Sequence, residues 1–250
     1  MAISSLSLKE DIGFSNIFKQ IKYNRDFYKK NPTYFRPDGL VIFCGPQGSG
    51  KTLSAVNYVY NLLKFYPNCL IVSNVDLTDY PVDNKRIFEF KEAKDLTRYK
   101  NGKEGVIFLI DEIQLYFNSL GSKNIDIDVM TQISQQRKQR IHIVATSQVF
   151  GRMAKPLREQ FDVVIYCQKK FFGFLQKNSL IDRNSIDGES STGTQLKGKI
   201  VKNFYYFKNP LMFNRYDTYK VIENKNLSIE KDSNDIYTDN SSTYINIKRK

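Results

Sequence analysis

The chain has 250 residues, of which 41% are hydrophobic, so it is long enough to form one sizeable α/β domain with additions. No segment approaches about 20 uninterrupted apolar residues, so no membrane-spanning helix is predicted. Residues 1–11 lack the basic start and apolar core of a signal peptide, and we expect a cytoplasmic protein, in the host cytoplasm if it is viral. The net charge of +12 favours an anionic partner, of which nucleic acid is the simplest, although it also suits a generically basic soluble protein.

The cysteines and the single histidine do not predict a metal site. Cys44, Cys69 and Cys167 lie in or beside apolar, strand-like segments and have no C-x-x-C spacing, so we expect reduced core residues. His142 lies within the apolar run 141–145, where a packed core role is favoured over catalysis. A single histidine excludes a histidine-cluster metal site.

Residues 1–38 are predicted to form a helical lead-in, with a helix over 14–29. Basic and aromatic side chains alternate along it: Phe18, Lys19, Lys22, Tyr23, Arg25, Phe27, Tyr28, Lys29 and Lys30. We expect an amphipathic helix that packs on the core and leaves its basic face in solvent. Contact with nucleic acid through charge and stacking is the alternative.

The most specific motif follows an apolar run at 40–44, which is predicted to be a buried strand. The motif is G-x-x-x-x-G-K-[ST], formed by Gly45, Pro46, Gln47, Gly48, Ser49, Gly50, Lys51 and Thr52. Its glycines let backbone N–H groups turn towards phosphates, and a predicted helix at 52–65 adds the field of its N-terminus. Lys51 then reaches the β- and γ-phosphates, and Thr52 can ligate Mg²⁺. The pattern predicts ATP and Mg²⁺ as cofactors.

A second motif follows the next apolar segments. Strands are predicted at 69–73 and 106–110, and the latter ends in Asp111 and Glu112. Ligands of parallel sheets bind at the carboxyl ends of the strands, so Asp111 is predicted to hold Mg²⁺ through water beside the phosphate loop. Glu112 is then placed to orient or deprotonate the attacking water. The alternative is that the two carboxylates only cap the following helix.

A third group of candidate residues surrounds the strand predicted at 141–146. The helix before it, predicted over 127–139, ends in a basic segment with Arg137 and Arg140, and the strand is followed by Gln148. Gln148 could sense the nucleotide, and either arginine could reach a neighbouring subunit's nucleotide, Arg140 being the first choice. Arg152 and Arg158 are runners-up. The alternatives are that Gln148 is only a polar residue at the start of a loop and that the arginines are only solvated residues at a helix end.

The predicted fold is α/β: a P-loop NTPase with a mainly parallel central sheet flanked by helices, plus a small C-terminal β addition. A further strand at 163–167 completes an ATPase core over 39–170. Residues 171–223 alternate aromatic and polar side chains and form the β-rich addition, with a loop in the middle. Residues 224–250 are polar and are predicted to be a flexible tail.

The segments 45–52, 109–114, 135–140 and 145–148 together resemble the HerA/FtsK-type branch of the additional-strand P-loop ATPases. In that branch an Asp-Glu pair is followed by a helix with basic residues and by a strand that ends in a polar sensor, usually Gln. The resemblance covers residues 40–170, about half of the chain. Within the branch, 109–114 with Phe117 is similar to the zonular-occludens-toxin-like assembly ATPases of filamentous phages. Residues 214–219 also resemble phage ATPases of this type.

The other similar group is the small DNA-packaging ATPases of tailless and related viruses. The assembly group usually carries a transmembrane segment after the ATPase domain, and its absence here favours a packaging motor. The resemblance therefore implies an ATPase that translocates DNA, most simply double-stranded and without sequence preference. Its expected partners are a homo-oligomeric ring, because a finger arginine needs a neighbour, and a capsid portal or other phage structural protein. A membrane-associated assembly ATPase and a non-motor P-loop switch or kinase are the alternatives.

Overall fold

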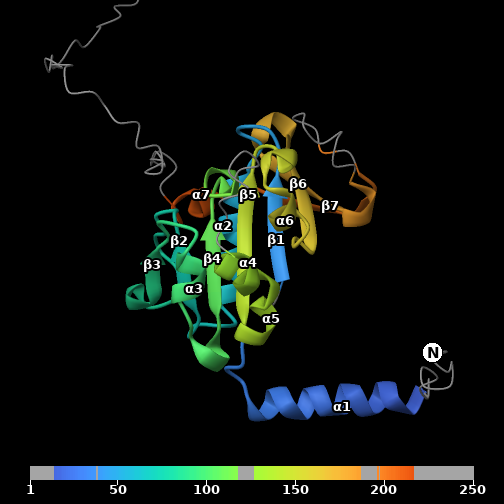
Figure 1. Cartoon of the computed structure of the whole chain (residues 1–250). Helices are drawn as coiled ribbons and strands as arrows, with labels where there is room; N and C mark the ends of the chain where they lie inside the picture. Colours follow the sequence, from blue (N-terminus) through green and yellow to red (C-terminus); the bar gives the residue numbers. More distant parts are fainter. Residues whose placement is uncertain (1–13, 38, 118–126, 187–195, 197, 217–250) are drawn as a thin grey trace, which may run out of the picture. The chain divides into compact units, whose positions relative to one another are not determined.

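One eight-stranded sheet organises the described part of the chain (Figure 1). The computed structural model describes residues 14–37, 39–117, 127–186, 196 and 198–216. They belong to one compact unit, Met1–Lys220, and the second unit, Val221–Lys250, which contains the predicted tail, lies outside the described residues. In chain order the strands are β1 (Gly39–Cys44), β2 (Leu70–Ser73), β3 (Ile87–Glu89), β4 (Val106–Ile110), β5 (Ile141–Ser147), β6 (Val163–Lys170), β7 (Leu175–Ile181) and β8 (Ile200–Phe207).

The strand order across the sheet is β3-β2-β4-β5-β1-β6-β7-β8. Every pair from β3 to β6 is parallel, whereas β7 and β8 pair antiparallel at one end. In the register, Cys44 lies opposite Ser147 and Ile110 lies opposite Ala145. The carboxyl ends of β1, β4 and β5 therefore meet at one edge, where the loops that follow them come together.

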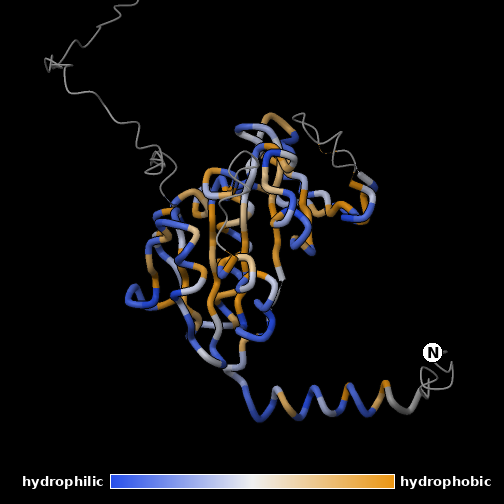
Figure 2. Tube along the Cα trace, in the orientation of Figure 1, coloured by the Kyte–Doolittle hydropathy of each residue, from blue (hydrophilic) through white to orange (hydrophobic). Residues whose placement is uncertain are grey.

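Helices cover both faces of this sheet. In chain order the helices of the described residues are α1 (Phe14–Lys30), which does not cover the sheet, α2 (Lys51–Leu63), α3 (Asp95–Arg98), α4 (Ile127–Ser134), α5 (Gln136–Gln139), α6 (Lys155–Arg158) and α7 (Pro210–Phe213), with short 3₁₀ turns η2 (Asn84–Arg86), η3 (Gly102–Glu104), η4 (Ile113–Leu115), η6 (Phe150–Arg152), η7 (Phe171–Gly173) and η8 (Arg183–Ser185). Val56 and Val59 of α2 pack in one apolar cluster, and Ile133 of α4 and Leu157 of α6 pack in the other. Figure 2 shows the central strands as continuously hydrophobic, as expected for strands buried on both faces.

The predicted fold class is confirmed: the sheet is mainly parallel, helices flank it, and β7 and β8 form the C-terminal β addition. The predicted strands at 40–44, 69–73, 106–110, 141–146 and 163–167 correspond to β1, β2, β4, β5 and β6. Strand β3 was not predicted, because its three residues are too few to show a periodic pattern. The middle loop of the addition lies largely outside the described residues.

The helix predicted over 127–139 is wrong as a single element. It is broken at Gln135, whose ψ of 8° ends α4 before α5 begins. Paired side-chain amides of Gln132 and Gln139 bridge the break, with Gln139 Nε2 2.8 Å from Gln132 Oε1. Sequence periodicity continues through such a break, so the pattern could not reveal it.

The packing predicted for the N-terminal helix is also wrong. α1 forms over Phe14–Lys30, close to the expected range, but the apolar side chains described along its length from Ile17 to Ile21 do not enter the core. Ile17, Phe18 and Ile21 are all more than half exposed. The end of the helix makes aromatic contacts instead, where Phe27 meets Tyr34 edge-on with ring centroids 5.0 Å apart.

The buried roles predicted for the histidine and the cysteines are confirmed. His142 is 1% exposed, with Nδ1 3.0 Å from the Gly39 carbonyl oxygen and Nε2 3.1 Å from the Tyr58 hydroxyl. Cys44, Cys69 and Cys167 are buried and free. Among the described residues, no helix is long and apolar enough to cross a membrane.

Candidate active site

The phosphate loop connects β1 to α2 at the carboxyl edge of the sheet. Residues Gly45–Gly50 turn the chain after Cys44, and α2 begins at Lys51 with its first N–H groups facing the loop. The Lys51 side chain is buried, and its ammonium lies 3.3 Å from the Pro46 carbonyl oxygen and 3.8 Å from Glu112 Oε1. The sequence motif therefore has the geometry of an anion-binding loop.

Only glycine fits at position 50, because of both the backbone conformation and the surroundings. Its φ of +89° lies in the left-handed region, and an added Cβ would come 2.2 Å from Gln176 Oε1. Gln176, in β7, donates from Nε2 to the Ser49 carbonyl oxygen over 2.9 Å. A strand from the C-terminal addition thus supports the phosphate loop.

Asp111 lies beside the loop, as predicted. Its Oδ1 accepts hydrogen bonds from the Thr52 hydroxyl at 2.8 Å and from the Thr146 hydroxyl at 2.6 Å. These contacts join the ends of β4 and β5 to the start of α2. The alternative role of Asp111, as a simple cap of the following turn, does not account for its bond to Thr52.

Glu112 has a strained backbone that directs its carboxylate back towards the loop. Its φ and ψ are 50° and 54°, a left-handed conformation that is costly outside glycine and is often found at functional sites. The Glu112 N–H donates to the Thr146 hydroxyl over 2.9 Å, which holds this conformation. Gln148 Nε2 donates to Glu112 Oε1 over 3.1 Å, and Gln114 also donates to its carboxylate. Lys51, Glu112 and Gln148 therefore meet at one point.

Asn74 supports the site and was missed in the sequence. It follows β2, and its side-chain amide brackets the backbone of Asp111: Oδ1 accepts from the Asp111 N–H at 2.7 Å, and Nδ2 donates to the Asp111 carbonyl oxygen at 2.8 Å. A polar residue directly after a buried strand was the only available signal. Thr146, near the end of β5, was noted in the sequence only as part of the segment 145–148 and was given no role of its own.

The Thr52 hydroxyl and the Asp111 carboxylate are suited to Mg²⁺, which prefers hard oxygen ligands. Burial raises the pKa of Asp111, and the hydrogen bonds from Thr146 and Thr52 oppose that rise. A cation here would favour the ionised carboxylate. No group of three or more His, Cys, Asp or Glu side chains in the described ranges could hold a metal, so phosphate oxygens and water would supply the other ligands.

A cleft of about 920 Å³ opens beside the loop, a size suited to a nucleotide. Gly48, Lys51, Glu112 and Gln148 line one part of it. The rest is lined mainly by aromatic and basic residues that follow β6 and β8 or end them: Lys169, Phe172, Phe174, Lys208, Pro210, Phe213 and Tyr216. Burial and the nearby Lys169 lower the pKa of Lys208.

A buried polar network connects α2 to β7 and β8. The Asn178 amide lies 3.2 Å from the Ser54 hydroxyl, and that hydroxyl lies 3.0 Å from the Tyr206 hydroxyl. Gln176 Nε2 also lies 3.2 Å from Asn178 Oδ1. Sequence reasoning assigned no role to this region, although polar residues at alternating positions of a strand share one face and could have indicated a buried network.

The arginines lie at different ends of the sheet. Arg140 precedes β5, and Gln148 follows it, so they are separated by on the order of 25 Å. The Arg140 guanidinium stacks on Tyr34, 4.3 Å from the ring centroid, and Nη2 lies 3.0 Å from the Tyr34 hydroxyl. Arg137 is exposed in α5 at the same end. The structure therefore brings neither of the two preferred arginines to the phosphate loop of its own chain.

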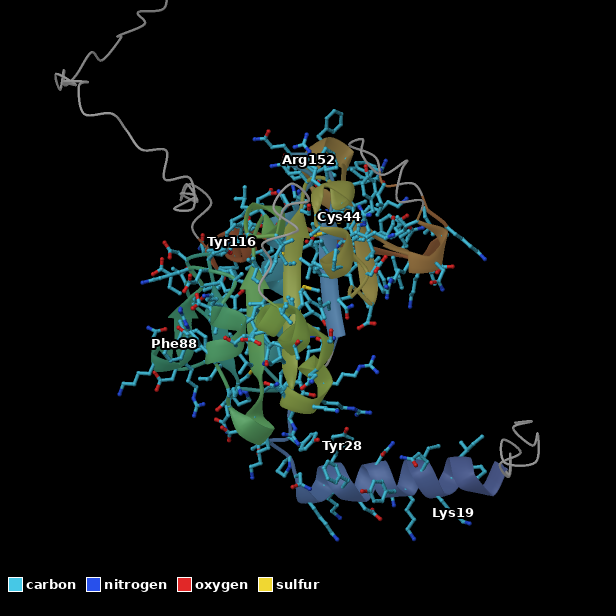
Figure 3. The ribbon with its side chains drawn as sticks, in the orientation of Figure 1. Lys19, Tyr28, Cys44, Phe88, Tyr116 and Arg152 are labelled. Carbon is cyan, nitrogen blue, oxygen red and sulfur yellow. The ribbon has the colours of Figure 1, made fainter. Side chains whose placement is uncertain are left out.

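The two runners-up follow the carboxyl end of β5, near the loop. Figure 3 shows Arg152 at the end of the sheet where Cys44 finishes β1. Arg152 is exposed, whereas Arg158 donates from Nη1 to the Gly151 carbonyl oxygen over 3.1 Å. Of the four candidates, Arg152 thus lies at the edge of the sheet that carries the phosphate loop and presents an exposed side chain.

The profile of the zonular occludens toxin (Zot) family matches residues 39–241, well over half of the chain. The chain belongs to the Zot family. This match confirms the resemblance inferred from the motifs at 45–52 and 109–114. No curated protein gives a significant match to the sequence.

Several solved structures are similar to this Zot-family chain. The N-terminal domain of zonular occludens toxin from Neisseria meningitidis is 16% identical, with a TM-score of 0.49, covering 73% of this chain and 100% of that domain. The genome packaging NTPase B204 from Sulfolobus turreted icosahedral virus 2, in complex with sulfate, is 14% identical, with a TM-score of 0.45, covering 67% and 97%. The flagellar accessory protein FlaH from Methanocaldococcus jannaschii is 16% identical, with a TM-score of 0.41, covering 58% and 78%.

Replacing Glu112 by Gln in this Zot-family chain should leave ATP binding intact and slow hydrolysis by ~10²-fold or more, the usual range for losing a general base. The amide keeps the shape and the contact with Gln148 but cannot accept a proton. Phosphate release and titration with a fluorescent ATP analogue would measure the two effects. Glu159→Gln, at an exposed carboxylate of a surface ion pair, is the matched control. If the Glu112→Gln variant instead lost ATP binding, with hydrolysis falling only as far as the loss of binding requires, Glu112 would be structural.

Proposed function

We propose that this Zot-family chain is an ATP-hydrolysing motor that translocates DNA during phage assembly. The observation that carries the proposal is the meeting of Lys51, Glu112 and Asp111 at the mouth of the phosphate loop. The family match and the net charge of +12 support a phage-associated role with an anionic partner.

The chemistry follows from the positions of the side chains. Lys51 and the loop N–H groups bind the β- and γ-phosphates. Thr52, directly, and Asp111, through water, would hold Mg²⁺, which would supply positive charge beside the phosphates. Glu112 orients water for attack on the γ-phosphorus and accepts its proton. The hydrogen bond from Gln148 restrains that carboxylate and connects it to the end of β5. ADP and phosphate are the products.

The carboxylate pair favours hydrolysis over transfer to a small molecule. Glu112 directly follows Asp111 and faces Lys51 at 3.8 Å, a position suited to activating water. A kinase would need its carboxylate base beside the hydroxyl of a bound acceptor, and a nucleotide switch does not depend on a base for fast hydrolysis. Between the two motor roles, the Zot family match favours assembly, and packaging of DNA into a capsid is the second candidate on the resemblance of the motifs to viral packaging ATPases.

The active form is proposed to be a homo-oligomeric ring in the host cytoplasm, in contact with a capsid portal or another phage structural protein. A ring lets an arginine of one subunit face the nucleotide of the next. Light scattering of the purified protein, with and without ATP, measures the mass of the assembly and hence the number of subunits. A monomer that hydrolyses ATP at full rate would contradict the ring.

DNA should stimulate ATP hydrolysis, and its affinity should fall steeply as salt rises, because Lys and Arg contacts release counterions from phosphates. We expect little sequence preference, since backbone contacts hold every sequence alike. The experiment measures the ATPase rate with single- and double-stranded DNA of unrelated sequences between about 50 and 200 mM salt, as a salt range of roughly this width resolves such slopes. Displacement of streptavidin from biotinylated DNA then tests movement. ATP hydrolysis that ignores both DNA forms would favour a non-motor P-loop protein.

A further inference from the structure

The three strands at the antiparallel end of the sheet carry different side chains on their two faces. The register places Gln168, Lys177 and Tyr205 side by side, and next to them Lys170, Leu175 and Phe207. Tyr166 lies in the neighbouring row with Ser179 and Asn203. Directly opposed residues of paired strands share a face, so these rows form one surface. We call Tyr166, Lys170, Lys177, Tyr205 and Phe207 the aromatic–lysine face.

In the described part of the chain, this face is exposed at Lys170, Tyr205 and Phe207, half-buried at Tyr166 and Lys177, and closed at Ser179. Tyr205 is 57% exposed and Phe207 is 74% exposed, and Lys170 is exposed as well. The opposite face carries Gln176, Asn178 and Tyr206, which are turned towards the phosphate loop and α2. Phe204 of that opposite face is 44% exposed, so Tyr205 and Phe207 are the more exposed aromatic side chains of β8, and both lie on the aromatic–lysine face.

The charge of this end of the sheet is uniformly basic. Strands β6, β7 and β8 contain four lysines and no acidic residue: Lys169, Lys170, Lys177 and Lys202. Two of these, Lys170 and Lys177, lie on the aromatic–lysine face itself. Aromatic rings beside lysines on an open sheet are the combination that holds single-stranded nucleic acid, in which bases stack on the rings and the backbone lies along the positive charges.

We infer that the aromatic–lysine face binds single-stranded nucleic acid without sequence preference, with bases stacked on Tyr205 and Phe207 and phosphates held by Lys170 and Lys177. The two rings are two residues apart on β8, or about 7 Å, so each can take its own base. A single strand exposes its bases for this stacking, whereas a duplex does not. The inference rests on the proposed function and specifies the form of DNA and where it binds.

The same strand connects this face to the ATPase site. Lys177 and Leu175 flank Gln176 in β7, and Gln176 donates to the Ser49 carbonyl oxygen of the phosphate loop. A nucleic-acid strand bound on one face of β7 thus lies one residue away from Gln176, which supports the phosphate loop from the other face. Binding on the aromatic–lysine face is therefore expected to change the rate of ATP hydrolysis.

The test measures the affinity of the full chain for fluorescein-labelled oligo-dT and for a duplex of the same length by anisotropy. Tyr205→Ala and Phe207→Ala should each raise the Kd for oligo-dT roughly 5- to 100-fold, as expected for losing one stacked base, while Tyr205→Phe keeps the ring and the affinity. Phe65→Ala, at an aromatic side chain that is 76% exposed elsewhere, is the matched control. Circular dichroism and ATP-analogue binding should be unchanged in all four variants.

The outcomes separate this inference from the proposed function. If the wild-type chain binds and responds to DNA but the Tyr205 and Phe207 variants do so equally well, the inference is overturned and the motor stands. Tighter wild-type binding to the duplex than to oligo-dT also overturns it. If the wild type binds neither DNA form, both fail. The Tyr205 and Phe207 variants could instead keep their DNA affinity but form smaller oligomers, or no longer sediment with anionic phosphatidylglycerol vesicles. Either result would make this face a subunit or membrane contact instead.

Discussion

Replacement of Lys51 by alanine should abolish ATP hydrolysis, with a loss of ~10²- to 10³-fold or more, the range for removing one charge-stabilising donor from a reaction centre. The Lys51 side chain is 6% exposed and is the cation at the phosphate loop that faces Glu112. Backbone N–H groups alone cannot replace a full positive charge at the β- and γ-phosphates. Steady-state phosphate release and nucleotide titration would measure the loss.

The matched control is Lys64→Ala, at the other end of the same helix, where the ammonium lies 4.7 Å from the centroid of the Tyr60 ring. It removes the lysine at the C-cap of α2 without touching the nucleotide site and should keep near-normal turnover. A Lys51→Ala variant that is folded and hydrolyses ATP at the wild-type rate would contradict the assignment of the phosphate loop.

The second large effect concerns the arginine that we propose acts between subunits of the ring. We expect Arg152→Ala to lower turnover by ~10³-fold, the usual value of a finger arginine, because Arg152 is exposed at the edge of the sheet that carries the phosphate loop. Mixed with Lys51→Ala subunits, Arg152→Ala subunits should regain part of the activity. In such rings some intact arginines face intact phosphate loops.

Arg140→Ala provides the comparison, since sequence spacing alone ranks this arginine first. Its guanidinium stacks on Tyr34 and lies 3.3 Å from the Gly102 carbonyl oxygen, at the opposite end of β5. We expect this variant to lose up to about 1 kcal/mol of stability, typical of an exposed cation–π contact, with little change in turnover. The opposite result would be a ~10³-fold loss of turnover in Arg140→Ala that mixing with Lys51→Ala subunits rescues, with no loss in Arg152→Ala. That result would restore the ranking based on sequence spacing.

The sequence by itself determined the chemistry of the phosphate loop. Residues 45–52 are contiguous, and their function depends on local backbone turns and on the helix that follows, so a short motif carries the whole signal. The positions of Asp111 and Glu112 were also predictable. The carboxyl ends of adjacent parallel strands meet at one edge, and both residues directly follow such a strand.

Only the tertiary structure decided which residues support that site. Asn74 and Asp111 are 37 positions apart, and Gln176 is 127 positions from Ser49, the loop residue it holds. Local patterns contain no information on contacts at such separations, because these depend on how strands pair and in which register. The same holds for Arg140, which lies next to the site along the sequence but is separated from it by the length of β5.

The exposure of α1 and of the aromatic–lysine face has the same physical origin. Periodicity predicted an apolar side for α1 and alternating aromatic side chains in β8, but it cannot say whether another element covers them. In the structure the core is already closed by α2, α4 and α6, so Ile17, Phe18 and Phe207 remain in solvent. Burial depends on the packing of the whole chain, whereas the chemistry of the phosphate loop is contained in eight consecutive residues, 45–52.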